Sequence, residues 1–354
     1  MNFELTEERQ MLQDTLRRYL RDKYSTETRN KVLESETGMS AEVWTELAEL
    51  GVIGALFTES QGGFGGAGFD ISVVFEELGR AGVVEPVMEA LIAGQLLTMA
   101  GQDVSVVIAG DQHLAMAHTE ADVRYDLDGV GTIFSDGKLN GRKGMVMNAE
   151  AADQFVVSAM DGEIQLYLVA KDAPGIEIQG YPLLAGGRAA EVVFHNTPAQ
   201  ALGLGVAALE DAQAIGIVAQ CAETLGAMET ATDLTKEYLL TRKQFGRPIG
   251  MFQALQHRMS DMLIELEQAR SAVINAAGNL DQVPQTRDLA MSASKNLMGR
   301  AGRLIAEEAI QMHGGIAMTQ EYELAHIAKR IVMADHRFGD TDYHLERFIA
   351  LSAA

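Results

Sequence analysis

Apolar residues recur at three- and four-residue intervals through the first hundred positions, which is the pattern of amphipathic helices. The segments that show it begin directly after Thr6 and continue through residues 41–50, 69–81 and 87–100. Thr6 is a suitable N-cap, because its hydroxyl can accept a hydrogen bond from the first helical turn. Residues 1–103 are therefore predicted to form an all-helical N-terminal domain.

After Asp103 the apolar residues occupy alternate positions, as they do in half-buried strands. The expected strands are residues 106–109, 114–117, 155–159, 165–169 and 191–194. Asp136-Gly137 and Asp161-Gly162 are dipeptides that suit tight hairpin turns. The alternation predicts a β-domain over residues 104–202.

Helical periodicity returns near Ala207 and continues in four or five long segments to the end of the sequence. The first two segments, residues 207–240 and 251–279, are separated by a break that contains Gly246 and Pro248. A later helix is expected to open near Pro284, since proline is favoured in the first turn. Residues 203–354 are thus predicted to form a C-terminal helical domain.

The charge balance excludes several classes of function. The 354-residue chain carries 28 Lys and Arg against 50 Asp and Glu, a formal net charge of −22. Such a chain lacks the basic footprint that nucleic acids and anionic membranes require. The single cysteine, Cys221, excludes an internal disulfide and is expected to be buried in a helix. Without a long apolar run or a signal-like start, a soluble cytoplasmic protein is expected.

The break between the two long helical segments carries candidate chemistry. It reads Thr-Arg-Lys-Gln-Phe-Gly-Arg-Pro-Ile over residues 241–249. Arg242 could grip a phosphate through its guanidinium, and Phe245 could lie against a flat ligand. The alternative is a basic turn that is only solvated.

A second candidate closes a later helix. Gln311-Met312-His313 is followed by the paired glycines Gly314 and Gly315, which at a helix end serve most often as a C-cap. The N-terminal part of the chain carries two further candidate motifs. These are the glycine-rich residues 57–66 and the Glu-Glu-Leu-Gly run at residues 76–79.

Together, an R-K-x-F-G turn, a Q-x-x-G-G turn and these N-terminal stretches resemble the acyl-CoA dehydrogenase family over nearly the whole chain. Within it, the sequence is most similar to small subunits of heteromeric enzymes, of the pimeloyl-CoA dehydrogenase and steroid-degradation types. The resemblance implies an α+β fold: an N-terminal helical domain (1–103), a small β-barrel (104–202) and a C-terminal four-helix bundle (203–354). The periodicity independently supports the order α, β, α.

The resemblance also implies an activity and a cofactor. Members use FAD to dehydrogenate an acyl-CoA thioester between its α and β carbons, and pass the electrons to an electron-transfer flavoprotein. By motif, Arg242, Phe245, Gln311, Gly314 and Gly315 would hold the pyrophosphate and adenosine end of FAD across a subunit interface.

Asp340 is the candidate catalytic base. The family places a glutamate seven residues before an arginine, and counting back seven from Arg347 reaches Asp340. Aspartate is one methylene shorter, so the backbone would have to come closer to the substrate. A solvated turn or the N-cap of the following helix, residues 343–351, explains Asp340 equally well.

The β-domain departs from the family at its flavin-ring motifs. The Thr-Glu-Pro-Gly-Ala-Gly-Ser-Asp loop is reduced to Thr-Glu-Ala-Asp at residues 119–122, and Trp-x-Thr is replaced by Met145-Val146-Met147. The two methionines are expected to fill the core. We therefore expect a subunit without its own complete flavin-ring site, paired with a larger acyl-CoA dehydrogenase subunit.

Three readings of function stay open at this point. The chain can be such a subunit, a self-sufficient dehydrogenase or oxidase that uses Asp340 as its base, or a non-catalytic scaffold subunit. Four cations of the β-domain could touch the phosphates of CoA: Arg124, Arg142, Lys143 and Arg188. A formal G-x-G-x-x-G at residues 63–68 is not a Rossmann motif, because no strand–helix–strand pattern surrounds it. A flexible turn before a helix is expected there instead.

Overall fold

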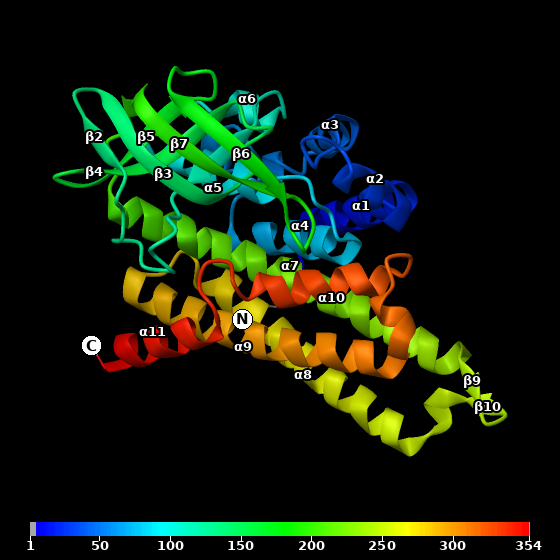
Figure 1. Ribbon diagram of the computed structural model, residues 1–354. Helices are drawn as coiled ribbons and strands as arrows, with labels where there is room; N and C mark the ends of the chain where they lie inside the picture. The colour runs from blue at the N-terminus through cyan, green and yellow to red at the C-terminus, as the bar shows by residue number, and fades with distance from the viewer. Residues whose placement is uncertain (1–4, 354) are drawn as a thin grey trace. The chain divides into compact units, whose positions relative to one another are not determined.

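The computed structural model describes residues 5–353, which fold into two compact units (Figure 1). One unit, the helical unit, comprises residues 5–29, 68–83 and 217–353; the other, the sheet unit, comprises residues 30–67 and 84–216. Two helices cross the boundary between them, α2 (Thr26–Leu33) and α7 (Val206–Thr241). The three contiguous domains remain a prediction, since these units are assembled from separated stretches of chain.

The helical unit confirms the helices that the apolar periodicity predicted near the two ends of the sequence. Its further helices are α1 (Glu7–Lys23), α4 (Gly68–Ala81), α8 (Gln253–Asn279), α9 (Pro284–His313), α10 (Glu323–Ala334) and α11 (Thr341–Ala353), with short 3-10 turns η3 (Ile249–Met251) and η4 (Gly314–Met318). Thr6 caps α1 by accepting from the Arg9 N–H, and Pro284 opens α9, both as predicted. Cys221 is buried, and burial raises the pKa of its thiol to about 12.

Helices α4 and α7 cross with their backbones in contact. A Cβ on Gly79 would lie 1.9 Å from the Glu223 carbonyl oxygen, and one on Gly226 would lie 1.9 Å from the Glu76 carbonyl oxygen. Close to this crossing, the Glu229 carboxylate accepts hydrogen bonds from two arginines on other helices, Arg80 and Arg270. The Glu-Glu-Leu-Gly run is therefore a packing element, because only glycine permits this approach.

The sheet unit begins with helices and ends in strands. Its helices are α3 (Ala41–Glu49), α5 (Val87–Met99) and α6 (Ser105–Ile108), with 3-10 turns η1 (Gly54–Leu56) and η2 (Glu59–Gln61). The glycine-rich stretch was expected to be flexible, but Gly63, Gly65 and Gly66 donate to the carbonyls of Thr58, Phe57 and Ala55. A Cβ on Gly63 would lie 2.3 Å from two of the carbonyl oxygens that surround it. This turn is packed tightly, and no nucleotide-binding strand–helix unit surrounds it.

Eight strands form one mixed sheet in the order β6-β7-β3-β2-β4-β5-β8, with β1 added to β4. Their bounds are β1 (Leu114–Ala117), β2 (Ile133–Ser135), β3 (Lys138–Met147), β4 (Gln154–Asp161), β5 (Glu163–Ala170), β6 (Ile176–Pro182), β7 (Arg188–Pro198) and β8 (Gln200–Ala201). Strands β1 and β2 run parallel to β4, and the remaining pairs are antiparallel. Asp136-Gly137 and Asp161-Gly162 form the predicted hairpin turns.

One predicted strand is wrong. Residues 106–108 lie in helix α6 and Ala109 is its C-cap. Asp103 accepts hydrogen bonds from the backbone and hydroxyl of Ser105 and so favours a helical turn. A short apolar run does not by itself distinguish a strand from a helical turn. The alternation also missed β2, β3, β6 and β8, where buried and exposed positions are less sharply separated.

Candidate functional site

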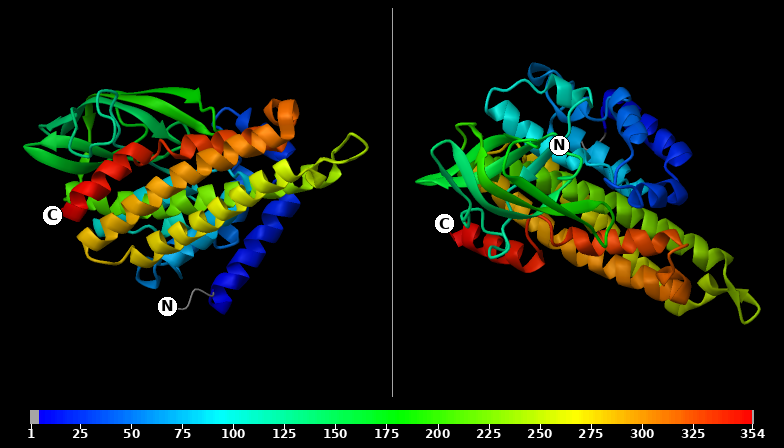
Figure 2. Two further views of the ribbon diagram at one scale, coloured as in Figure 1. Left: turned by 90° about the horizontal axis from the view of Figure 1, so that it is seen from below. Right: turned by 45° about the horizontal axis from the view of Figure 1, so that its top comes forward.

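The R-K-x-F-G turn forms a hairpin that projects from one end of the helical unit. Strands β9 (Lys243–Gln244) and β10 (Arg247–Pro248) pair antiparallel, with Phe245 and Gly246 at the turn in left-handed conformations. Figure 2 shows this hairpin beyond the ends of α7 and α8 in both views. Arg242 is exposed, and the residue Phe245 is 90% exposed. The turn therefore presents its candidate residues outward.

Next to this hairpin, the ring of Phe252 contacts both Arg247 and the exposed Phe245. The Arg247 guanidinium lies 4.3 Å from the centroid of the Phe252 ring, and Phe252 meets Phe245 edge-on at 6.1 Å. Arg247 is thus engaged with its own chain through a cation–π contact.

The Q-x-x-G-G motif ends helix α9, as predicted. Gly314 has φ +72° and its N–H donates to the Ile310 carbonyl, which closes the last helical turn. Gln311, Gly314 and Gly315 are all exposed, and a Cβ on either glycine would meet nothing within 4 Å. The main chain here is open to a close-fitting ligand.

An aromatic stack places these two motifs at one end of the helical unit. The rings of Tyr238 on α7 and His313 on α9 stack at 4.5 Å, and His313 meets Tyr322 at 5.4 Å. Sequence reasoning singled out neither tyrosine, because helical spacing alone does not reveal a partner on another helix. We call Arg242, Phe245, Gln311, Gly314 and Gly315 the tip residues from here on.

Asp340 has a different environment. It is 8% exposed, and its Oδ1 accepts from the Tyr343 N–H at 2.9 Å, so it is the N-cap of α11. The preceding backbone is fixed by Lys295, whose ammonium donates to the carbonyls of Ala334, Asp335 and Gly339 at 2.9–3.0 Å. The N-cap interpretation of Asp340 is confirmed, and its role as a base stays a prediction.

Asp340 and the tip residues lie at separate places along α9. The Asn296 side chain donates to the carbonyl of Thr341, next to Asp340. Gln311 lies fifteen residues further along the same helix, about 22 Å at the helical rise of 1.5 Å per residue. One small reacting group could not touch both places within a single chain.

The sheet unit holds a buried polar cluster where the flavin-loop motif begins. Lys143 is fully buried, and its ammonium donates to Glu120 Oε1 at 2.7 Å and to Ser158 Oγ at 3.0 Å. Glu120 also accepts from the N–H groups of Gly131 and Thr132. Glu120 therefore ties together both ends of the loop between β1 and β2.

Burial lowers the pKa values of two groups in this cluster. It lowers the pKa of Lys143 to about 8, against the raising effect of Glu120. It also lowers the pKa of His118 to about 4, helped by the neighbouring Lys143 charge. His118 Nδ1 lies 2.9 Å from Ser158 Oγ. Because these groups bond to one another, the cluster stabilises the fold of the sheet unit.

Two sequence expectations about the sheet unit are corrected. Met145 does not fill the core: it has φ +51° and is 49% exposed, since a bulge in the β3–β7 pairing turns it outward. Lys143 cannot touch a CoA phosphate, because it is buried against Glu120. Arg142 and Arg188 are paired with Glu191 and Glu150.

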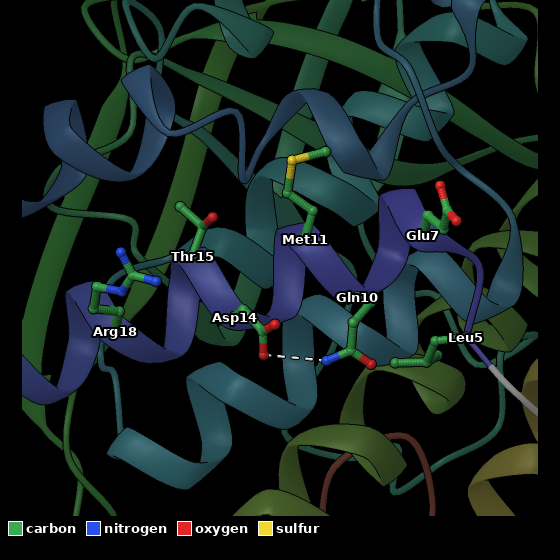
Figure 3. Close-up of a pocket in the computed structure, with 7 residues that line it drawn as sticks. All are labelled: Leu5, Glu7, Gln10, Met11, Asp14, Thr15 and Arg18. Atoms are coloured by element: carbon green, nitrogen blue, oxygen red, sulfur yellow. Dashed lines mark hydrogen bonds between the residues drawn. The ribbon is translucent and has the colours of Figure 1, made fainter.

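A surface hollow on α1 is not the site. Figure 3 shows its lining residues, all on α1 or just before it: Leu5, Glu7, Gln10, Met11, Asp14, Thr15 and Arg18. The hollow contains none of the candidate residues, and Gln10 donates to Asp14, one turn further along α1, at 3.1 Å. Within residues 5–353, no group of His, Cys, Asp or Glu side chains is placed to hold a metal ion. Across the same residues, no helix combines the length and the apolar character needed to traverse a bilayer.

Comparison with known proteins identifies the family. Residues 6–104 match the acyl-CoA dehydrogenase N-terminal domain, and residues 204–350 match the acyl-CoA dehydrogenase C-terminal domain. The acyl-CoA dehydrogenase IpdE2 of Mycobacterium tuberculosis is 31% identical over 328 residues, covering 92% of this chain and 91% of the relative. Benzylmalonyl-CoA dehydrogenase of Aromatoleum aromaticum is 29% identical over 351 residues, covering 91% and 92%.

Solved structures agree in fold. A variant of the Tcur3481–Tcur3483 steroid ACAD superposes with a TM-score of 0.91 at 28% identity, covering 98% of each chain. The butyryl-CoA dehydrogenase of Megasphaera elsdenii superposes with a TM-score of 0.89 at 24% identity over the full length of both chains. The predicted order of helices, central sheet and helices is confirmed, and this chain belongs to the acyl-CoA dehydrogenase family of FAD-dependent oxidoreductases.

Proposed function

We propose that this chain is one subunit of a heteromeric acyl-CoA dehydrogenase and contributes its tip residues to an FAD that a larger partner subunit holds. The reaction is the α,β-dehydrogenation of an acyl-CoA thioester. Bound FAD supplies the acceptor for the hydride that leaves the acyl chain. An electron-transfer flavoprotein then takes up the electrons.

The exposure of the tip residues carries this proposal. Phe245 is 90% exposed, so it is available to a molecule outside its own chain. The residue types fit a dinucleotide: Arg242 suits a phosphate fork and Gln311 offers an amide. Gly314 and Gly315 leave room for the main chain to approach a pyrophosphate.

The sheet unit supports the absence of a complete flavin-ring site. The side chain of Glu120 binds the backbone N–H groups of Gly131 and Thr132, so these donors are used within the chain. Met145 and Met147 offer thioethers, which cannot donate a hydrogen bond to a flavin edge. The buried Asp340 serves as an N-cap, which favours a silent subunit over a self-sufficient enzyme or oxidase.

The relatives suggest the substrate class. The structure that superposes at 28% identity is a steroid ACAD, and a 29% identical relative acts on benzylmalonyl-CoA. We therefore expect a bulky or cyclic acyl-CoA. Retained tip residues speak against a scaffold, since a scaffold needs no clamp for a pyrophosphate.

The test compares the chain alone with its complex. The tagged chain is purified from its native host to recover the partner, and the two are then co-expressed. We expect little FAD and negligible dehydrogenation from the chain alone, and both from the complex. In the complex, Arg242→Ala should weaken FAD binding at least about tenfold, because a charge-assisted contact is lost.

Arg303→Ala is the matched control for Arg242→Ala. It removes an exposed guanidinium from the same unit, one that pairs with Glu307 in its own helix. FAD affinity should not change in this variant. Stoichiometric FAD on the chain alone, together with turnover that Asp340→Asn abolishes, would contradict the silent-subunit proposal.

A further inference from the structure

We infer that His313 is a positioning residue that holds the two turns bearing the tip residues at one fixed spacing, acting through Tyr238 and Tyr322. This inference rests on the proposed function of the tip residues. It adds to that function the element that sets their mutual position. His313 itself is buried.

The hydrogen bonds of His313 define its tautomer. Nδ1 lies 2.8 Å from the Ala309 carbonyl oxygen, which can only accept, so Nδ1 carries the hydrogen. Burial lowers the pKa of His313, against the raising effect of the Ala309 and Leu234 carbonyls, and so favours the neutral ring in which Nε2 accepts. The Tyr322 hydroxyl, 3.1 Å from Nε2, therefore donates. One imidazole thus has two directional bonds on opposite sides of its ring.

The bond to Tyr322 closes the turn that holds the paired glycines. His313 directly precedes Gly314, and Tyr322 follows η4 and leads into α10. Gly314 and Gly315 have open space where a side chain would be, so their own packing does little to hold this turn. The contact between His313 and Tyr322 holds the two ends of this turn together.

The stack on Tyr238 connects this turn to the hairpin. The two rings lie 4.5 Å apart and 27° from parallel. Tyr238 stands one helical turn before Arg242, and its carbonyl accepts from the Arg242 N–H at 2.8 Å. The Arg242 carbonyl in turn accepts from the Ile249 N–H at 2.9 Å, which closes the hairpin base. A shift of His313 would therefore move Arg242 relative to Gln311.

Positioning and simple core packing predict different measurements. If the stack only stabilises the fold, disturbing it lowers the melting temperature and leaves FAD affinity of the folded complex unchanged. If it positions the tip, FAD affinity falls while kcat at saturating FAD is retained, because the reacting groups are untouched.

Tyr322→Phe is the mildest test, since it removes one hydroxyl and keeps the ring. In the co-expressed complex we expect FAD affinity to fall about fivefold, with kcat at saturating FAD unchanged. His313→Phe keeps a stacking ring but loses both hydrogen bonds, so its affinity loss should be larger. In His313→Gln, the side-chain amide oxygen can still accept from Tyr322, so the loss of FAD affinity should be smaller than in His313→Phe. Tyr19→Phe, the same change on α1, is the control and should bind FAD normally.

The outcomes separate this inference from the proposed function. Weakened binding in Arg242→Ala with normal binding in both Tyr322→Phe and His313→Phe would overturn the positioning role alone. Normal binding in Arg242→Ala would overturn the proposed function and the positioning role with it. If His313→Phe does not fold, Tyr322→Phe still decides between the two readings.

Discussion

At the tip of the helical unit, the side chains of the family motifs are exposed; in the sheet unit, the residues at the altered motifs are bonded within their own chain. Phe245 and Gln311 contribute little to the fold that presents them. Lys143 and Glu120 stabilise the fold and leave little for a ligand to bind. Under the proposed function, the exposed tip residues would contact FAD on a partner subunit, whereas the residues at the altered motifs stabilise the sheet unit itself.

Lys143→Ala should give the largest effect in the sheet unit. It leaves the Glu120 carboxylate without its cation and opens a cavity in a fully buried position. We expect a loss of about 3 kcal/mol in the free energy of unfolding. Urea denaturation measures it, with Arg142→Ala on the same strand as the control. A loss under about 1 kcal/mol for Lys143→Ala would show that the cluster contributes little to the stability of the sheet unit.

Acid should destabilise both units through buried histidines. Burial lowers the pKa of His118 and of His344 to about 4, against an ordinary value of 6.5. Between these values the unfolded chain binds a proton that the folded chain does not. The stability is therefore fully present above pH 6.5 and is lost as the pH falls toward 4.

At pH 5, each histidine should lower the free energy of unfolding by about 2 kcal/mol relative to pH 7. His344→Gln removes the titrating ring and retains an amide that can donate to the Phe338 carbonyl, as Nε2 does at 2.8 Å. Denaturation at pH 7 and pH 5 should therefore show a smaller pH dependence in this variant. If the free energy of unfolding of His344→Gln depended on pH as strongly as that of the unmodified chain, His344 would not be one of the groups that cause the acid destabilisation.

Substitutions of Asp340 distinguish its role as an N-cap from a role as the catalytic base. Asp340→Asn keeps a good N-cap, so stability should change by less than about 0.5 kcal/mol, whereas Asp340→Ala should cost about 1 kcal/mol. If the subunit is silent, both complexes retain kcat. A base would make Asp340→Asn at least about a hundredfold slower, which rate measurements on the complex detect directly.

Phe245→Ala should have the smallest effect on stability and the sharpest contrast with Lys143→Ala. Because this residue is 90% exposed, the isolated chain should lose no more than about 0.5 kcal/mol. The complex should bind FAD about tenfold less tightly, since aromatic anchors dominate interfaces. Equal stability losses for Phe245→Ala and Lys143→Ala would remove the basis of the comparison.

The sequence by itself determined the elements that local rules control. Thr6, Pro284 and the Asp-Gly turns mark helix starts and hairpins through bonds within a few residues, and each was predicted correctly. Helical periodicity predicted the long helices of the C-terminal half because their apolar faces repeat over many turns. The motif residues also indicated the family, because their spacing is a property of the chain alone.

Only the tertiary structure decided what these residues contact. Met145 faces outward, because a bulge in the pairing of β3 with β7 turns it away from the core. His313 meets Tyr238 and Tyr322 from other elements, and Lys143 meets Glu120 across 23 residues of chain. Such contacts depend on how distant segments pack, and the order of residues along the chain does not encode that packing locally.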